Sequence, residues 1–354
     1  MNSHHPETKS PVETPRHERR EEGVAMIYVA VFLLSSLWFA SLAIDMGKLM
    51  TTRTELQRAA DAAALAGASS IDPTNGNIVQ DSARVRAAYT SSQNTALEDK
   101  SRAVTIDPAS DVTFPNVHKV RVQVHREAAT GNPMTTTFAR TVGVPTLDVT
   151  AHAVAEVSPL SKVCDRLVPF APVVQGTPFS TACGTSYTLK AASGTSGNFQ
   201  LLDFPDCNEG PCADASAGGG AAEVKCLMIH GYGCCIGIGD NFTDTQPGNK
   251  LGPLRDALQQ RWDADTDHSA ACFQSYSGNG QRVLPVPIVK TFDVNGKKNA
   301  TITGFGAFFL LARPTGGGQN MQITGQFIDY LAPGEFGPPP PSGPVLYGVH
   351  LVQD

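Results

Sequence analysis

Residues 24–44 read VAMIYVAVFLLSSLWFASLAI, and residues 45–70 continue with DMGKLMTTRTELQRAADAAALAGASS. The first stretch holds 21 residues without a charge. As an α-helix it would be about 31 Å long, which matches the hydrocarbon core of a bilayer, about 30 Å thick. The hydroxyls of Ser35, Ser36 and Ser41 can bond to carbonyls of their own helix, so they are compatible with a span. The sequence therefore predicts a transmembrane helix over 24–44.

A cleaved signal peptide is the main alternative to this anchor, because Ser41-Leu42-Ala43 resembles a small-residue cleavage site. The apolar run, however, is longer than the roughly 7–15 residues of a signal-peptide core. Helical sequence also continues through the candidate cleavage site. A buried core helix of this length would rarely lack every charge. These features favour an uncleaved anchor.

The orientation of the anchor is predicted mainly from the cysteines. Residues 1–23 are polar and contain three prolines, which predicts a disordered tail. Four basic residues precede the span and three follow it closely, a weak positive-inside signal. All eight cysteines lie between Cys164 and Cys272, and an even count in one region favours disulfides and an oxidising compartment. We therefore expect a cytoplasmic tail and a remainder that faces outward, which in a bacterium means an inner-membrane span and a periplasmic remainder.

The stretch 45–70 is rich in Ala, Leu, Gln and Arg and has no proline, which predicts a helix that continues the span. Small residues recur at four-residue spacing on it, as Ala59, Ala63 and Gly67 and as Ala60, Ala64 and Ala68. Such a face allows another backbone to approach closely. The sequence leaves two interpretations open: this face packs against a helix of another protein, or against the chain's own sheet.

This stretch resembles the N-terminal segment of the TadE/TadG-like Flp (tight adherence) pilus-assembly family. The residues that carry the resemblance are Asp45, Gly47, Arg53, Leu56, Gln57, Ala59, Ala60, Asp61, Ala62, Ala63, Ala64, Leu65, Ala66, Gly67 and Ala68. The resemblance implies an inner-membrane, pseudopilin-like component of a secretion machine. It also implies membrane lipid and other pseudopilin-like or Tad membrane components as partners. The large region after the helix resembles that of TadG-like members.

Two features of related proteins, a peptidase processing site and a metal-binding loop, are not matched in this sequence. Gly23 is followed by Val24 to Tyr28, without the glutamate found at the fifth position in processed pilins, so processing by a prepilin peptidase is not predicted. Some long members carry a metal loop of the form Asp-x-Ser-x-Ser. The nearest string here, Asp214 to Gly218, lacks the second serine, and we interpret it as a loop without a metal.

The remaining sequence predicts an α+β fold, in which a mostly antiparallel, disulfide-containing β region follows the long helix. A second helix is expected at Ile78–Ala96 and a third at Leu254–Trp262, and Met134–Val142 is expected to form a short helix or strand. The expected strands are Ala103–Ile106, Lys119–Val124, Val149–Val157, Val283–Phe292, Thr301–Leu311, Met321–Leu331 and Val345–Val352.

We divide the chain into five segments. They are the tail 1–23, the span 24–44, a helix-plus-sheet unit 45–160, a cysteine-rich β unit 161–337, and a proline-rich spacer with a final strand at 338–354. This division follows changes in composition and periodicity along the chain.

The eight cysteines allow 105 pairings. They are Cys164, Cys183, Cys207, Cys212, Cys226, Cys234, Cys235 and Cys272. We expect Cys164–Cys183 and Cys207–Cys212 as local bridges, with the other four supplying two more. Zinc is the competing interpretation, but only Cys207 and Cys212 come near a zinc-binding spacing and only His230 lies nearby. We therefore expect no metal.

Charge and motifs exclude several functions. The chain has 27 Lys and Arg against 33 Asp and Glu, a net charge of −6, which argues against nucleic-acid binding. No nucleophile elbow, phosphate-binding loop, zinc-protease helix or complete dinucleotide-binding motif occurs. We therefore expect neither an enzyme nor a cofactor. The expected function is a non-enzymatic pilus-assembly component, and the alternative is a membrane-tethered, adhesin-like module that binds an envelope or surface molecule.

Overall fold

The computed structural model describes residues 18–94, 104–164, 166–172, 179–191, 198–213, 220–243, 251–289, 299–317, 320–340 and 343–353. The predicted tail, apart from its last six residues, and the loop at 214–218 therefore lie outside the described residues. Two compact units divide the described chain. The first comes from Met1–Glu55 and His125–Thr150, and the second from Leu56–Val124 and Ala151–Asp354.

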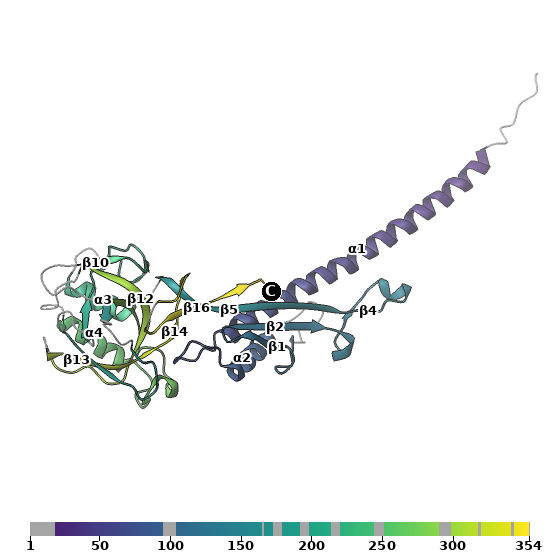
Figure 1. Cartoon of the computed structure of the whole chain (residues 1–354). Helices are drawn as coiled ribbons and strands as arrows, with labels where there is room; N and C mark the ends of the chain where they lie inside the picture. The colour runs from purple at the N-terminus through teal and green to yellow at the C-terminus, as the bar shows by residue number, and fades with distance from the viewer. Residues whose placement is uncertain are drawn as a thin grey trace, which may run out of the picture. The chain divides into compact units, whose positions relative to one another are not determined.

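The long N-terminal helix is present and unbroken. Helix α1 runs from Glu18 to Ala68, 51 residues, and Figure 1 shows it as one continuous ribbon. Its described stretch Val24–Ala68 is long and apolar enough to cross a membrane. Within it, the Ser35 and Ser41 hydroxyls donate to the carbonyls of Phe32 and Trp38, at 2.9 and 2.8 Å. These serines therefore satisfy their own polar groups, as the sequence predicts.

The first unit holds, besides the start of α1, a small hairpin made of β3 and β4. The elements here are a 3-10 turn at Ala128–Thr130, β3 (Met134–Thr135), a 3-10 turn η2 (Ala139–Val142) and β4 (Thr146–Leu147). The strands pair antiparallel, with Met134 opposite Leu147. The segment predicted as a short helix or strand at 134–142 thus contains both, a short strand and then a 3-10 turn.

The second unit contains two larger sheets. The first has the order β1-β2-β5-β16-β14, and β9 and β15 also pair with β5. Its strands are β1 (Val112–Asn116), β2 (Lys119–Arg126), β5 (Val149–Cys164), β9 (Cys235–Gly237), β14 (Tyr330–Leu331), β15 (Gly334–Phe336) and β16 (Leu346–Val352). Strand β14 pairs parallel with β16, whereas β1 pairs antiparallel with β2, and β5 pairs antiparallel with β9, β15 and β16. Residues 119–124 alternate as predicted, with Val120, Val122 and Val124 buried.

The second sheet has the order β10-β12-β13-β7-β8-β6, with β11 also pairing with β12. Its strands are β6 (Phe170–Pro172), β7 (Tyr187–Ala191), β8 (Asn198–Leu201), β10 (Asn241–Thr243), β11 (Val283–Val289), β12 (Asn299–Leu310) and β13 (Gln322–Ile328). All seven residues of β11 are buried, because the two faces of this strand contribute to two different hydrophobic clusters.

Three further helices belong to the second unit: α2 (Gln80–Ser92), α3 (Ala221–His230) and α4 (Leu251–Asp263). A short 3-10 turn at Phe273–Ser275 follows α4. Helices α3 and α4 contact one another, as Figure 1 shows, and together cover one face of the second sheet through residues such as Met228 and Leu258. The α+β fold class predicted from the sequence is confirmed; the predicted domain boundaries stay predictions.

One predicted strand is wrong. Residues 104–106 form no strand, and Ala103 lies outside the described residues. The backbone of Val104 instead closes the end of α2: its N–H donates to the Asn94 carbonyl at 2.8 Å, and its carbonyl accepts the Ser91 hydroxyl at 2.9 Å. Because its one N–H donates to the helix end, Val104 has no donor left for a strand ladder.

Candidate functional site

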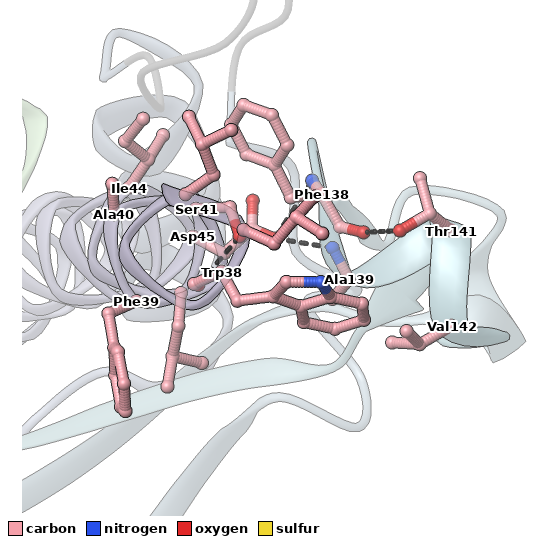
Figure 2. A pocket seen from close by; sticks show the side chains of 13 residues that line it. Trp38, Phe39, Ala40, Ser41, Ile44, Asp45, Phe138, Ala139, Thr141 and Val142 are labelled. Carbon is pink, nitrogen blue, oxygen red and sulfur yellow. Dashed lines mark hydrogen bonds between the residues drawn. The ribbon is translucent and has the colours of Figure 1, made fainter. Parts of the chain in front are cut away.

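Asp45, the first residue after the predicted span, accepts three backbone hydrogen bonds within the first unit. It is only 5% exposed. One carboxylate oxygen accepts the N–H of Thr137 at 2.7 Å, and the other accepts those of Phe138 and Ala139 at 2.9 and 2.6 Å (Figure 2). A single carboxylate therefore attaches the start of η2 to α1.

The electrostatics of this attachment favour the ionised carboxylate. Burial raises the pKa of Asp45. The backbone N–H donors of Thr137, Ala139 and Phe138 and the nearby Lys48 lower the pKa by more than burial raises it. The pKa therefore lies below its ordinary value of 3.8. The Lys48 ammonium also donates to the Thr137 hydroxyl at 2.9 Å. At neutral pH the carboxylate is therefore charged and fully able to accept these donors.

An apolar groove lies beside this attachment. Its volume is about 790 Å³. Its lining residues come from the end of the span and from the η2 segment: Leu34, Leu37, Trp38, Phe39, Ala40, Ser41, Leu42, Ile44, Asp45, Phe138, Ala139, Thr141 and Val142. Figure 2 shows Trp38 between the helix and the segment that carries Ala139 and Val142. The apolar surface of the span therefore continues onto the η2 segment, and together they form the groove.

The other motif residues divide by the face of α1 on which they lie. Leu56, Ala59, Ala60, Ala63, Ala64, Gly67 and Ala68 are buried, whereas Asp61, Ala62, Leu65 and Ala66 are half-buried. Gly47 and Arg53 are exposed. Gln57 donates to the Asp61 carboxylate at 2.8 Å and to the His152 carbonyl at 3.0 Å. The small-residue face is therefore turned inward, and the Gly47 side is turned outward.

The inward face packs against the chain's own α2 and β2. A Cβ placed on Gly67 would lie 3.3 Å from the Ala83 carbonyl oxygen, 3.5 Å from Val120 Cγ2 and 3.6 Å from Ala87 Cβ. Ala83 and Ala87 are themselves buried. Of the two interpretations that the sequence left open, packing against the chain's own structure is the one observed, and α2 shares this contact with the sheet. We refer to this contact as the α1–α2 seam.

All eight cysteines form disulfides, but the expected pairs Cys164–Cys183 and Cys207–Cys212 are wrong. The observed bridges are Cys164–Cys235, Cys183–Cys272, Cys207–Cys234 and Cys212–Cys226. Register explains the first of them, because β9 lies antiparallel to β5 with Cys235 directly opposite Cys164. The adjacent residues Cys234 and Cys235 consequently have different partners. Spacing along the chain could not show this.

A charged cluster around Arg282 is the main feature that sequence reasoning missed. Arg282 is fully buried, 3.6 Å from the Asp265 carboxylate, and its guanidinium lies over the rings of Trp262, Tyr276 and Phe309. The Tyr276 hydroxyl donates to Asp265 at 2.5 Å. Because Arg282 and Asp265 are shielded from solvent, this cluster supports the interior and offers no access to a substrate. In the described ranges no group of three or more His, Cys, Asp or Glu could hold a metal ion.

Comparison with known families assigns the N-terminal segment. Residues 23–70 match the family described as putative Flp pilus-assembly TadE/G-like. No curated protein and no solved structure matches the chain. The match confirms the family resemblance and covers the span, Asp45 and the whole small-residue face. The chain therefore carries a TadE/G-like segment of the Flp pilus-assembly family.

Proposed function

We propose that this chain is a TadG-like, non-enzymatic component of Flp pilus assembly, held in the bacterial inner membrane by residues 24–44. The observation that carries the proposal is the family segment 23–70. In this structure that segment combines a helix able to cross a membrane with the Asp45 attachment and the α1–α2 seam. The same helix therefore supplies an anchor and contributes to the core of a folded domain.

Two observations support a periplasmic position for that domain. Its four disulfides need an oxidising compartment. The basic residues before the span outnumber those just after it, four to three, as expected for a cytoplasmic N-terminus.

The outward face of α1 after the span is the surface we assign to contacts with other pseudopilin-like or Tad membrane components. Gly47, Met50, Arg53 and Thr54 are exposed on it. A Cβ on Gly47 would meet no atom within 4 Å, so the chain's own packing does not need glycine there. Glycine inside a helix costs about 1 kcal/mol relative to alanine. Close approach of a partner helix explains why that cost is accepted.

Mild solubilisation of membranes, followed by isolation of the tagged chain and identification of what accompanies it, tests this proposal. We expect a secretion ATPase, its membrane platform and small pilin-like subunits. Gly47→Leu should reduce their recovery. Gly252→Leu is a matched control, because Gly252 also lies in a helix with no atom within 4 Å of a Cβ.

Two outcomes would contradict the proposal. Recovery of envelope or surface molecules alone would favour the alternative function, a membrane-tethered, adhesin-like binding module. Equal recovery of assembly components with both leucine variants would show that the Gly47 face is not where they bind.

A further inference from the structure

The segment between β3 and β4 is apolar and exposed, and it lies next to the end of the span. We call residues 136–145, TTFARTVGVP, the tip loop. Phe138 is 41% exposed, Val142 54% and Val144 42%. The loop contains no acidic residue and one cation, Arg140. An exposed apolar cluster of this kind marks a surface that contacts something other than water.

The groove places the tip loop beside the last turns of the span. Phe138 and Val142 line the same groove as Leu34, Leu37 and Trp38. Leu34 precedes Ile44 by ten residues, which is about 15 Å of helix. If the span crosses a bilayer, lipid surrounds the helix at this level. The tip loop then lies at the membrane interface, and its apolar side chains continue the lipid-facing surface.

The backbone of the tip loop is suited to a medium poor in water. Its bonded N–H groups are those of Thr136, Thr137, Phe138, Ala139, Thr141, Gly143 and Val144, and residue 145 is proline. The hydroxyls of Thr136 and Thr141 donate to carbonyls of the same loop, at 2.6 and 2.7 Å. An unbonded backbone N–H group is strongly unfavourable in hydrocarbon, and the loop avoids this at each of these positions.

We propose that the tip loop inserts into the interface of the leaflet nearest Asp45, where it forms a second contact between the protein and the membrane. Phe138, Val142 and Val144 contact lipid there, and Arg140 and Lys48 face the phosphates. Anionic lipid is favoured, because its phosphates attract basic residues close to the membrane surface. The Asp45 charge does not oppose this, since three backbone N–H groups already bind it.

Lipid quenching of a new tryptophan tests this insertion in the full-length chain. Val142→Trp and Val85→Trp are compared in vesicles of phosphatidylcholine and phosphatidylglycerol, with or without bromine on the acyl chains. Val85 is the control: it is 68% exposed on α2, which packs against Gly67, and it lies outside the groove. The native Trp38 and Trp262 contribute the same background to both variants.

We expect the added emission of Val142→Trp to be quenched more by brominated lipid, and less by aqueous iodide, than that of Val85→Trp. Equal quenching of the two variants by brominated lipid would overturn the proposal. Protection of Val142→Trp from both quenchers would also overturn it, because a protein would then cover the loop.

This inference shares with the proposed function only the requirement that residues 24–44 cross a membrane. Loss of assembly partners with intact lipid quenching would refute the function and leave the tip loop's role standing. The reverse result would refute the tip loop's role alone.

Discussion

Gly67→Leu distinguishes most clearly between packing within the chain and packing against a partner. If the small-residue face met another protein, leucine at this position would spare the fold and abolish association. The structure predicts that leucine disturbs the fold first, because the space beside Gly67 is already filled by α2 and β2. The variant should destabilise the chain itself.

The magnitude follows from the contacts at that position. The Cβ alone would lie 3.3 Å from the Ala83 carbonyl oxygen, which is backbone and cannot rotate away. The remaining three carbons of leucine would then crowd Ala87 and Val120. Overpacking of this kind costs about 1–3 kcal/mol, and the better helix propensity of leucine returns less than about 1 kcal/mol. We expect a net loss of about 1 kcal/mol, which lowers Tm by roughly 2–4 °C for a domain of this size.

Thermal unfolding of the full-length chain in detergent, followed by near-UV circular dichroism, measures this loss. Gly47→Leu makes the same chemical change on the exposed face of the same helix and should not lower Tm, because no atom lies within 4 Å of a Cβ there and leucine has the better helix propensity. An unaltered Tm for Gly67→Leu, together with loss of assembly partners, would refute the α1–α2 seam as an internal contact.

Two further predictions concern carboxylates. Asp45→Ala removes the acceptor of three backbone N–H groups, so amide exchange within 136–145 should accelerate markedly, as measured by mass spectrometry; Asp45→Asn, which keeps one acceptor oxygen, should have a smaller effect. Burial raises the pKa of Asp329 to about 6, assisted by Asp72 and opposed by the Val345 N–H. Between about pH 4 and 6 the folded chain therefore retains a proton that the unfolded chain has lost, so the free energy of unfolding falls as pH rises through this range, by at most about 3 kcal/mol. Asp329→Asn should flatten this dependence and stabilise the chain at pH 7, as measured by denaturant unfolding.

Each of these two predictions has an outcome that would contradict it. Unchanged amide exchange in Asp45→Ala would show that other contacts hold the tip loop. A pH dependence that Asp329→Asn leaves intact between pH 4 and 6 would assign the proton to another group.

Local patterns were sufficient to predict the long helix, the half-buried strand at 119–124 and helix α4. The long helix follows from an uncharged run of membrane-spanning length and a proline-free, Ala-rich continuation, and the strand follows from its alternating apolar residues. The buried run Val283–Val289 was likewise predictable as a strand, although its position between two clusters was not.

Contacts between distant residues were not predictable. Asp45 binds backbone N–H groups more than 90 residues away. Every residue except proline has such a group, so the sequence does not show which of them Asp45 binds. The Cys164–Cys235 bridge depends on how β9 aligns with β5, which spacing along the chain does not show. The small residues of α1 indicated that another backbone packs closely against this face. Nothing in the sequence around Ala83 and Ala87 indicated that α2 supplies this backbone.

Site-specific photocrosslinking at Gly47 in native membranes tests the central claim most directly. A Cβ at position 47 has no atom of the described chain within 4 Å, so a photoreactive residue fits there, and the same residue at Gly252 is the control. We predict that position 47 alone captures a pilin-like or Tad membrane component. Capture of no protein at position 47, or of the same proteins at both positions, would contradict the assignment of this helix face to pilus assembly.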